Sequence, residues 1–223
     1  MKILVFNDYC VTGNIAMKAN ISALSQNGHE VFGVPTKIFS SNMSYKDYIS
    51  FYMPNFSEIV KKIFEIQKID AIYIGFIDDE EIFEIIKDIL QKFKGKVILD
   101  PILGDNGVKY FGTTGKQIAF YREILKFADA VTPNLTEAIL LTDYNKNFSE
   151  IEIEDVEKIA SNLLEMGAKQ IIIKSFEKNN ILNTLCFSEN TIKWFESKKI
   201  DVVHISFVKI IVIKAYLFCT TLL

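Results

Sequence analysis

The sequence has few of the residues that build metal and disulfide sites. Its 223 residues include three cysteines, Cys10, Cys186 and Cys219, and two histidines, His29 and His204. The cysteines form no CxxC pair and show no metal-ligand spacing, which argues against a zinc site and against a disulfide framework. This cysteine usage is typical of a reducing compartment, so we expect a cytoplasmic protein.

The chain also lacks long runs of one charge, and long apolar runs are confined to its end. The net charge is −3 with acidic and basic residues mixed, so no nucleic-acid partner is expected. The apolar run at residues 3–6 is shorter than the roughly 7–15 residues of a signal peptide. Residues 202–223 are mostly apolar, but two lysines and a histidine interrupt them, which argues against a membrane span.

The glycine-rich motifs of common nucleotide-binding folds are missing as well. No GxGxxG follows the first apolar run, which argues against a dinucleotide-dependent dehydrogenase. Residues 112–116 look like part of a P-loop. Their glycines are too close together, however, and Gln117 stands where a Ser or Thr would meet the metal, so a P-loop is excluded.

Short β-branched apolar runs alternate with amphipathic stretches along the chain. The runs predict strands over residues 3–6, 31–34, 71–74, 97–99, 130–131 and 170–173. Apolar residues at helical spacing predict helices near residues 56–64, 82–89 and 153–164. This alternation predicts one α/β domain with a mainly parallel sheet and helices on both faces.

Local signals refine these boundaries. We expect Asn55 to cap the first of the three helices and Ser149 to start the last. Gly28, Gly95 and Gly167 stand where helix C-caps are expected. Residues 181–187 and 191–195 predict a β-hairpin, and residues 36–52 predict a lid or an edge hairpin.

Polar side chains follow the later predicted strands. In open α/β sheets ligands bind at the carboxyl ends of the strands, so we expect these side chains to meet at one edge. Carboxylates suit Mg²⁺, a lysine neutralises phosphate, and phosphoryl transfer needs mainly positioning and charge neutralisation. The set predicts a site for a magnesium–nucleotide complex, formed by Asp100, Asp105, Thr132, Asn134, Glu137, Lys174 and Ser175.

Several of these residues also have a purely structural interpretation. Asp100 before a proline suits a turn. Asn134 and Glu137 have the spacing of a helix N-cap and its partner three residues later. Lys174 could be a solvated surface lysine. These separate interpretations do not predict that the residues converge.

Two segments resemble signatures of pyridoxal/pyridoxamine kinases. Residues 100–110 resemble the signature DPV-x-x-D-x-G-x-x-Y, and residues 132–138 resemble T/V-P-N-x-x-E-A. The start of the chain, with Asn7 and Asp8, and the segment after Pro35 are similar to the family's opening motif and lid. The resemblance implies a ribokinase-like three-layer sandwich over residues 1–200. An atypical apolar tail at residues 201–223 would replace the family's C-terminal helical cover. We expect a frame change or truncation near residues 200–205 as the cause, with a naturally shortened protein as the alternative.

The resemblance also implies an activity, cofactors and residue roles. The activity is ATP-dependent phosphorylation of the 5′-hydroxymethyl group of pyridoxal, pyridoxamine or pyridoxine, with Mg²⁺ and with K⁺ as a further candidate cofactor. A homodimer is expected. The nucleotide would contact Asp100, Thr132, Asn134, Glu137, Lys174, Ser175 and Tyr110. The metal would lie near Asp100, Asp105 and Glu137. The substrate ring would face Asp8, Ser41, Asn42, Tyr45 and Gly75.

The sequence departs from the family at two places. The lid histidine and threonine are replaced by Asn42 and Met43. The family's Gly-Thr-Gly-Asp motif, with its anion-binding helix start and its basic aspartate, has no counterpart, because no glycine follows Gly167 and Asp201 is the one aspartate beyond it. We therefore identify no catalytic residue and expect impaired phosphorylation. A hydroxymethylpyrimidine kinase and a non-catalytic nucleotide- or vitamer-binding protein remain as alternatives.

Overall fold

The computed structural model describes residues 1–198 except residues 44, 46, 179 and 180. The predicted apolar tail at residues 201–223 and the missing helical cover therefore lie outside the described residues. The described chain forms two compact units, one from Met1 to Val97 and one from Ile98 onward. None of the described helices is both long enough and apolar enough to cross a membrane.

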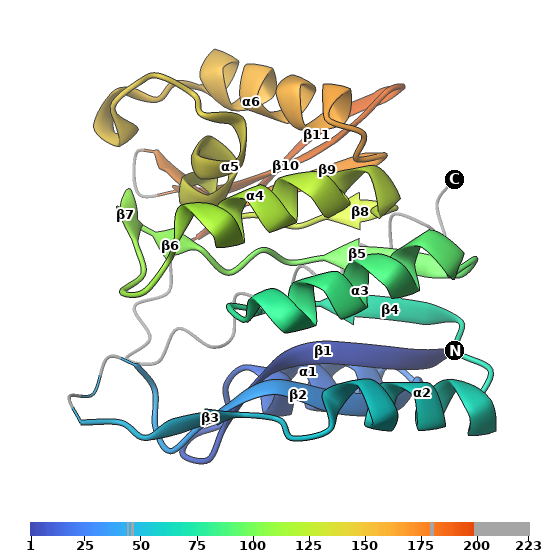
Figure 1. Cartoon of the computed structure of the whole chain (residues 1–223). Coiled ribbons are helices and arrows are strands. Elements are labelled where there is room, and N and C mark those ends of the chain that lie inside the picture. The colour runs from blue at the N-terminus through green and yellow to red at the C-terminus, as the bar shows by residue number, and fades with distance from the viewer. Residues whose placement is uncertain (44, 46, 179–180, 199–223) are drawn as a thin grey trace. The chain divides into compact units, whose positions relative to one another are not determined.

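The first unit contains four strands in the order β4-β1-β2-β3 (Figure 1). β1 pairs in parallel with β2 and β4, and β3 is antiparallel to β2. Helix α1 lies on one face of β1 and β2, and α2 lies on the other. The strands are β1 (Lys2–Cys10), β2 (Glu30–Phe39), β3 (Ser50–Tyr52) and β4 (Ala71–Ile74), and the helices are α1 (Met17–Gln26), α2 (Phe56–Ile66) and α3 (Glu80–Lys92).

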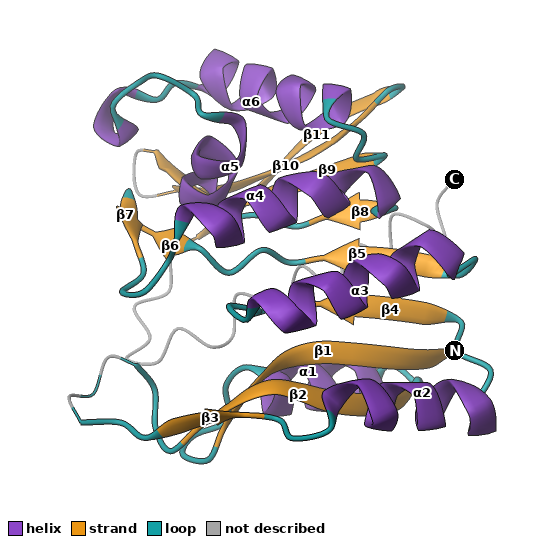
Figure 2. Cartoon of the chain, viewed as in Figure 1, coloured by secondary structure: helices purple, strands orange, loops and turns teal. Residues whose placement is uncertain are grey.

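The second unit contains strands in the order β11-β10-β9-β8-β5 (Figure 2). β5, β8 and β9 are parallel, whereas β10 and β11 form an antiparallel hairpin against β9. The strands are β5 (Lys96–Leu99), which begins in the first unit, β8 (Ala130–Val131), β9 (Gln170–Lys178), β10 (Ile181–Ser188) and β11 (Thr191–Lys198), together with a separate ribbon of β6 (Gly104–Asp105) and β7 (Val108–Lys109). The helices are α4 (Gly115–Ile124), α5 (Leu135–Thr142) and α6 (Ile153–Glu165), with short 3-10 turns at Leu125–Phe127 and Phe148–Glu150.

The apolar runs form the strands because both faces of these strands are covered. Leu4, Val5 and Phe6 are fully buried in β1, and four consecutive residues of β4 are buried in the same way. Continuous burial is typical of parallel strands that lie between helices. The helices, in contrast, each bury one stripe, as the buried residues Ile82, Phe83, Ile86 and Leu90 of α3 show.

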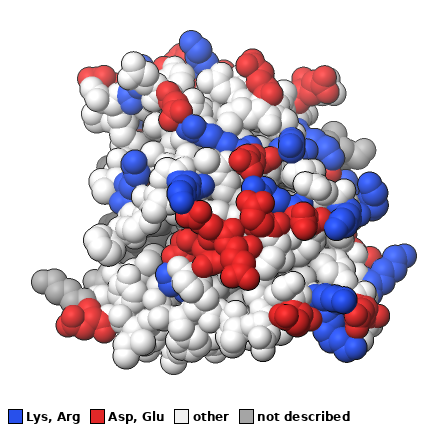
Figure 3. All heavy atoms as spheres, in the orientation of Figure 1, with Lys and Arg blue, Asp and Glu red and all other residues white. Residues whose placement is uncertain are grey.

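The charges at the two ends of α3 match the direction of the helix dipole. The side chain of Asp79 accepts a hydrogen bond from Ile82 N and caps α3, whose first turn carries Glu80 and Glu81. Figure 3 shows acidic side chains gathered over this end of α3. Negative charge at a helix N-terminus stabilises the helix by roughly 0.3–1 kcal/mol per group.

The predicted strands and the C-terminal hairpin are confirmed, and residues 36–52 contain the edge hairpin of β2 and β3. The predicted start of α2 directly after Asn55 is confirmed, but three details of the predicted helix ends are wrong. Asn55 is left-handed and makes no side-chain cap, and α6 begins with a capping box of Glu152 and Asp155 rather than at Ser149. Gly95 is no C-cap. A Cβ on Gly95 would lie 2.3 Å from Asp70 O, so a close backbone approach requires this glycine.

Candidate nucleotide and substrate site

A buried ion pair joins Asp100, directly after β5, to Lys174 in the middle of β9. Lys174 Nζ lies 2.6 Å from Asp100 Oδ1, and the two residues are 4% and 2% exposed. The hydroxyl of Thr132, just beyond β8, donates to the same carboxylate oxygen at 3.1 Å. Lys174 is therefore not a solvated surface lysine, and groups from three neighbouring strands and the residues that follow them meet at one carboxylate.

A β-bulge aims Lys174 at this carboxylate. Ile173 pairs with Leu185 and Phe176 pairs with Asn183, so Lys174 and Ser175 together oppose a single residue of β10. Ser175 has a left-handed φ of 63°, a conformation that costs a non-glycine residue about 1–3 kcal/mol. Bulges often reorient a side chain beside a functional site, and this one turns the lysine toward Asp100.

The segment that begins α5 is joined to the loop after β5. Asn134 Oδ1 accepts from Glu137 N at 2.9 Å, and Glu137 Oε2 accepts from Asn134 N at 2.8 Å, which forms a reciprocal capping box. Asn134 Nδ2 also donates to Gly104 O at 2.8 Å, and Leu103 N donates to Glu137 Oε1 at 3.4 Å. The structural interpretation of Asn134 and Glu137 is therefore confirmed, and the same two side chains bring the two sequence signatures together.

The ribbon of β6 and β7 carries Asp105 out from this buried network. Its two-residue turn consists of Asn106 and Gly107, with φ values of 49° and 78°, as a type I′ hairpin requires. Gly107 N donates to Thr136 Oγ1 at 2.8 Å, which fixes the turn against α5. Asp105 is half-buried, and its carboxylate accepts from Asn106 N at 3.0 Å.

Three carboxylates influence the phenol of Tyr110, which follows β7. Burial, and then the negative charges of Glu137, Asp105 and Asp100, raise the pKa of Tyr110 above its ordinary value of 10.0. All three carboxylates therefore act electrostatically on one hydroxyl group of the second unit.

The carboxylates suit Mg²⁺ only when a nucleotide supplies further oxygen ligands. The described residues contain no cluster of three or more His, Cys, Asp and Glu side chains that could hold a metal alone. Asp100 is held by Lys174, and both Glu137 oxygens accept backbone hydrogen bonds. Mg²⁺ usually takes one or two carboxylates plus phosphates and water. The arrangement fits this pattern, with Asp105 as the carboxylate least committed to other groups.

In the first unit, Asn7 joins the carboxyl ends of β1 and β4. Its Oδ1 accepts from Phe76 N at 2.7 Å and from Asp8 N at 2.9 Å. A Cβ on Gly75 would lie 2.5 Å from the Asn7 amide, so the close approach of these strand ends requires glycine. Two of the predicted ring contacts, Asp8 and Gly75, therefore lie beside one buried amide.

The other predicted ring contacts lie in the segment between β2 and β3. Tyr45 N donates to Asn42 O at 2.9 Å, and the Tyr45 side chain is 64% exposed. Ser41 is half-buried and Asn42 is exposed. These three residues therefore form an open local turn.

The sequence interpretation gave no site role to three buried groups of the first unit. Thr36 Oγ1 donates to Phe76 O at 2.6 Å, and the Phe39 and Phe76 rings meet edge to face with centroids 5.9 Å apart. Thr36 and Phe39 lie in the segment after Pro35, and Phe76 follows Gly75. Their positions next to motif residues are the feature by which the sequence could have singled them out.

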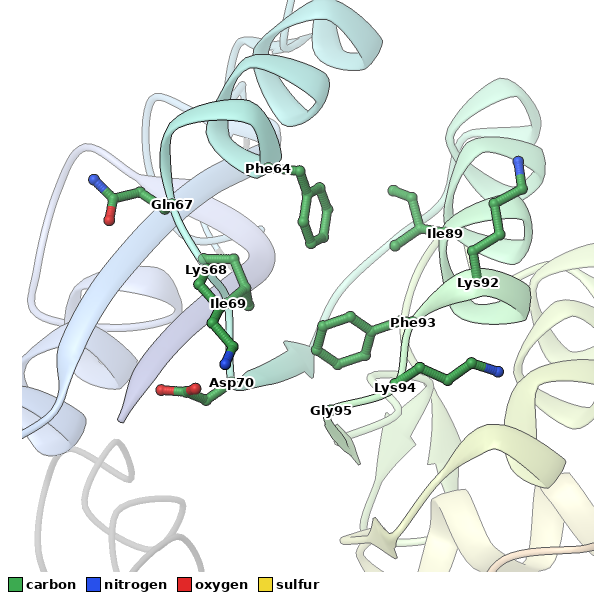
Figure 4. A pocket seen from close by; sticks show the side chains of 10 residues that line it. All are labelled: Phe64, Gln67, Lys68, Ile69, Asp70, Ile89, Lys92, Phe93, Lys94 and Gly95. Atoms are coloured by element: carbon green, nitrogen blue, oxygen red, sulfur yellow. The ribbon is translucent and has the colours of Figure 1, made fainter.

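A cavity of about 620 Å³ in the first unit lies away from these groups, beside residues that precede β4 and β5 (Figure 4). The rings of Phe64 and Phe93 point into it, whereas the ammonium ends of Lys92 and Lys94 point away. A small-molecule site needs a few converging polar groups as well as apolar walls. This cavity does not show them, so we do not assign the nucleotide or the substrate to it.

The parallel α/β architecture and the polar groups at the carboxyl strand ends define the ribokinase-like class of small-molecule kinases. The chain belongs to the phosphomethylpyrimidine kinase family, which matches residues 12–206. It is 26% identical over 202 residues to the hydroxymethylpyrimidine/phosphomethylpyrimidine kinase of Aquifex aeolicus, covering 89% of this chain and 70% of that enzyme. It spans only 58% of the length of sheep pyridoxal kinase, to which it is 26% identical.

Two solved structures have the same fold. Pyridoxal kinase from Entamoeba histolytica superposes with a TM-score of 0.83 at 20% identity, covering 96% of this chain and 82% of that one. Pyridoxal kinase from Leishmania donovani in complex with ADP and pyridoxamine superposes with a TM-score of 0.75 at 21% identity, covering 88% and 72%. The predicted ribokinase-like fold and kinase family are thereby confirmed.

Substitutions at the buried pair test its structural role. We expect Lys174→Met and Asp100→Asn each to lower the free energy of unfolding by about 3–5 kcal/mol, because each leaves one buried group without its partner. The double variant should lose less than the sum of the two. Lys169→Met, which removes a lysine that is 65% exposed and pairs with Asp129, should cost less than about 1 kcal/mol. Urea denaturation measures all four, and a Lys174→Met variant as stable as the parent would contradict the expectation.

The titration of Tyr110 tests the convergence of the carboxylates. A phenolate absorbance titration of the parent minus that of Tyr110→Phe should show Tyr110 ionising above pH 10. Because Tyr110 of the unfolded chain ionises near pH 10, the folded chain should lose stability as the pH rises beyond that value. Mg²⁺ with ADP should lower the pH of ionisation by offsetting the negative field. A midpoint at or below pH 10 in the folded protein would contradict the arrangement.

Proposed function

We propose that the protein binds ATP with Mg²⁺ and phosphorylates the 5′-hydroxymethyl group of a vitamin B6 compound, namely pyridoxal, pyridoxamine or pyridoxine. The observation that carries the proposal is the junction in the second unit where Asn134 and Glu137 fasten the start of α5 to the loop after β5. The carboxylates, the lysine and the helix N-terminus of the second unit are the kinds of group that can bind a metal-bound triphosphate, and they support the proposal.

The residues divide into framework and ligand groups in this proposal. Asp100, Lys174, Asn134 and Glu137 are buried and hydrogen-bonded in two pairs, Asp100 with Lys174 and Asn134 with Glu137, so they would shape the site and set its field. Asp105, on the half-exposed hairpin, would hold Mg²⁺, which when bound neutralises phosphate charge. Thr132, Ser175 and Tyr110 would line the nucleotide. Asp8, Gly75 and the residues Ser41, Asn42 and Tyr45 would face the ring.

The known relatives support both halves of this assignment. The Leishmania enzyme is described in complex with ADP and pyridoxamine, which are the nucleotide product and the vitamer class proposed here. A homodimer and a cytoplasmic location remain predictions from the family resemblance, as does K⁺ as a further cofactor.

A hydroxymethylpyrimidine is the second candidate substrate. The matching family and the Aquifex relative are both named for phosphorylation of that ring. The replacement of the lid histidine and threonine by Asn42 and Met43 removes two groups through which the pyridoxal-kinase resemblance would support a pyridine ring. Calorimetric titration with pyridoxine and with 4-amino-5-hydroxymethyl-2-methylpyrimidine distinguishes the two, because the favoured ring should bind at least tenfold more tightly.

Removal of one carboxylate tests the metal-nucleotide site. We expect Asp105→Asn to weaken binding of ADP with Mg²⁺ by about tenfold or more, since a charged hydrogen-bonding or ligand group contributes roughly 1.5–3 kcal/mol. Binding of ADP in EDTA should change less than twofold. Glu165→Gln, at an exposed position on α6, should leave both affinities unchanged. Equal effects of Asp105→Asn with and without Mg²⁺ would remove Asp105 from the metal site.

Turnover should be slow even where both ligands bind. The 223 residues contain no Gly-Thr-Gly-Asp motif, and a chain without it would lack a general base worth about 10²–10⁴-fold and an anion hole worth about 10²–10³-fold. Kinases of this kind of chemistry typically turn over at about 1–100 per second, so we expect a kcat below about 0.1 per second with pyridoxine and MgATP. An ordinary rate in a coupled ADP-release assay would contradict this, whereas tight binding without any turnover would favour a non-catalytic binding protein.

A further inference from the structure

A second β-bulge, in the first unit, also reorients a lysine. Asn7 of β1 pairs with Pro35 of β2, and Tyr9 pairs with Ile38, so a single residue of β1 faces both Thr36 and Lys37. Two neighbouring residues of a regular strand point to opposite faces, whereas a bulge can turn them in a common direction. The extra residue thus changes where the Lys37 side chain can reach.

Both residues of the bulge reach the loop that follows β4. Thr36 Oγ1 donates to Phe76 O at 2.6 Å. Lys37 Nζ lies 2.7 Å from Asp78 Oδ2, and the two side chains are 15% and 22% exposed. An ion pair shielded to this degree is screened less than a surface pair, such as Lys62 with Glu65 at 69% and 48% exposure.

The same ammonium group also contacts β3. Lys37 pairs in register with Tyr52, and its Nζ lies 4.6 Å from the centre of the Tyr52 ring and 3.4 Å from the Tyr52 hydroxyl. It lies 5.4 Å from the centre of the Phe39 ring. Burial opposes the charge on Lys37, but Asp78 and Tyr52 outweigh it and raise the pKa of Lys37 above its ordinary value. Lys37 is therefore held charged between β3 and the loop.

We propose that Lys37 is a positioning residue that fixes the β2–β3 hairpin to the loop of residues 76–78, and with the hairpin the predicted ring contacts Ser41, Asn42 and Tyr45, which lie between its two strands. Thr36, Phe39 and Phe76 are buried at this junction, where the Thr36 hydrogen bond and the edge-to-face ring contact join them. The backbone of Phe76 is also bound by Asn7, beside the predicted ring contacts Asp8 and Gly75. The inference rests on the proposed function for the identity of the ring. The fixing of the hairpin by Lys37 is independent of that function.

Four variants isolate the charge from the packing. Lys37→Met keeps a long apolar stem and removes the ammonium, and Asp78→Asn removes its partner. Lys37→Arg restores a positive charge and serves as the rescue. Lys62→Met removes an exposed lysine of another pair in the same unit and serves as the matched control.

Hydrogen exchange measures the hairpin without any ligand. In Lys37→Met and Asp78→Asn the amides of residues 37–39 and 50–52 should exchange about tenfold faster than in the parent. Lys37→Arg should restore most of the protection, and Lys62→Met should change nothing in this region. Unchanged exchange in Lys37→Met would overturn the proposal directly.

Calorimetric titration then measures the effect on the substrate side. The probe is pyridoxine, because it lacks the aldehyde with which pyridoxal would react with lysines. Its binding should weaken about tenfold in Lys37→Met and Asp78→Asn and recover in Lys37→Arg, while binding of ADP with Mg²⁺ should change less than twofold. Faster exchange with unchanged pyridoxine affinity would overturn the positioning role.

The two proposals fail in different ways. If the parent protein binds neither pyridoxine nor the hydroxymethylpyrimidine, the proposed function is overturned, and with it the positioning of a substrate ring, while the exchange data still decide whether Lys37 fixes the hairpin. If the parent binds pyridoxine and Lys37→Met binds it equally well, the proposed function stands and the role of Lys37 is overturned.

Discussion

The second unit depends on one buried charge pair, Lys174 with Asp100. Two charges at 4% and 2% exposure have lost most of their hydration, and such a pair persists only when its geometry is good and its remaining hydrogen bonds are satisfied. Thr132 supplies one of those bonds from the neighbouring strand end. Because the pair joins the residue after β5 to the middle of β9, it constrains where the loop after β5 can lie, and that loop carries polar groups of the candidate site.

The same constraint limits the chemistry that each side chain can perform. The side chains of Asn134 and Glu137 form hydrogen bonds with the backbone at each other's positions and with the loop at Leu103 and Gly104. Their role is to hold the N-terminus of α5 and the loop together. The half-exposed Asp105, carried by its own hairpin, is the group that can exchange partners. A rigid, fully bonded framework with one more open carboxylate suits a site that takes its remaining metal ligands from the nucleotide.

The two units share one structural feature, a β-bulge that carries a paired lysine. In each, a bulge turns a lysine toward an aspartate that follows another strand, Lys174 toward Asp100 and Lys37 toward Asp78. One extra residue in β2 and one in β9 thus allow a lysine within a strand to form an ion pair with an aspartate that follows another strand. Such ion pairs are not strong sources of stability, but they accept few alternative arrangements because a misplaced charge would be left unpaired.

Much of the fold and part of the site could be read from the pattern of residues. The strands and the main helices followed from apolar periodicity, and the convergence of Asp100, Asp105, Asn134 and Glu137 followed from their positions after strands. The capping role of Asn55 and the start of the last helix at Ser149 were predicted wrongly, because Asn55 takes up a left-handed conformation and Glu152 caps α6. Local propensities are weak enough that packing decides between neighbouring candidates.

By itself the sequence determined the alternation of strands and helices, the two kinase signatures and the absence of a Gly-Thr-Gly-Asp motif, since these depend only on which residues follow one another. Only the tertiary structure decided that Lys174 pairs with Asp100 and that Lys37 pairs with Asp78. The pairings join residues 74 and 41 positions apart. They depend on bulges, whose presence is set by the register between strands and therefore by the packing of the whole sheet rather than by any local run of residues.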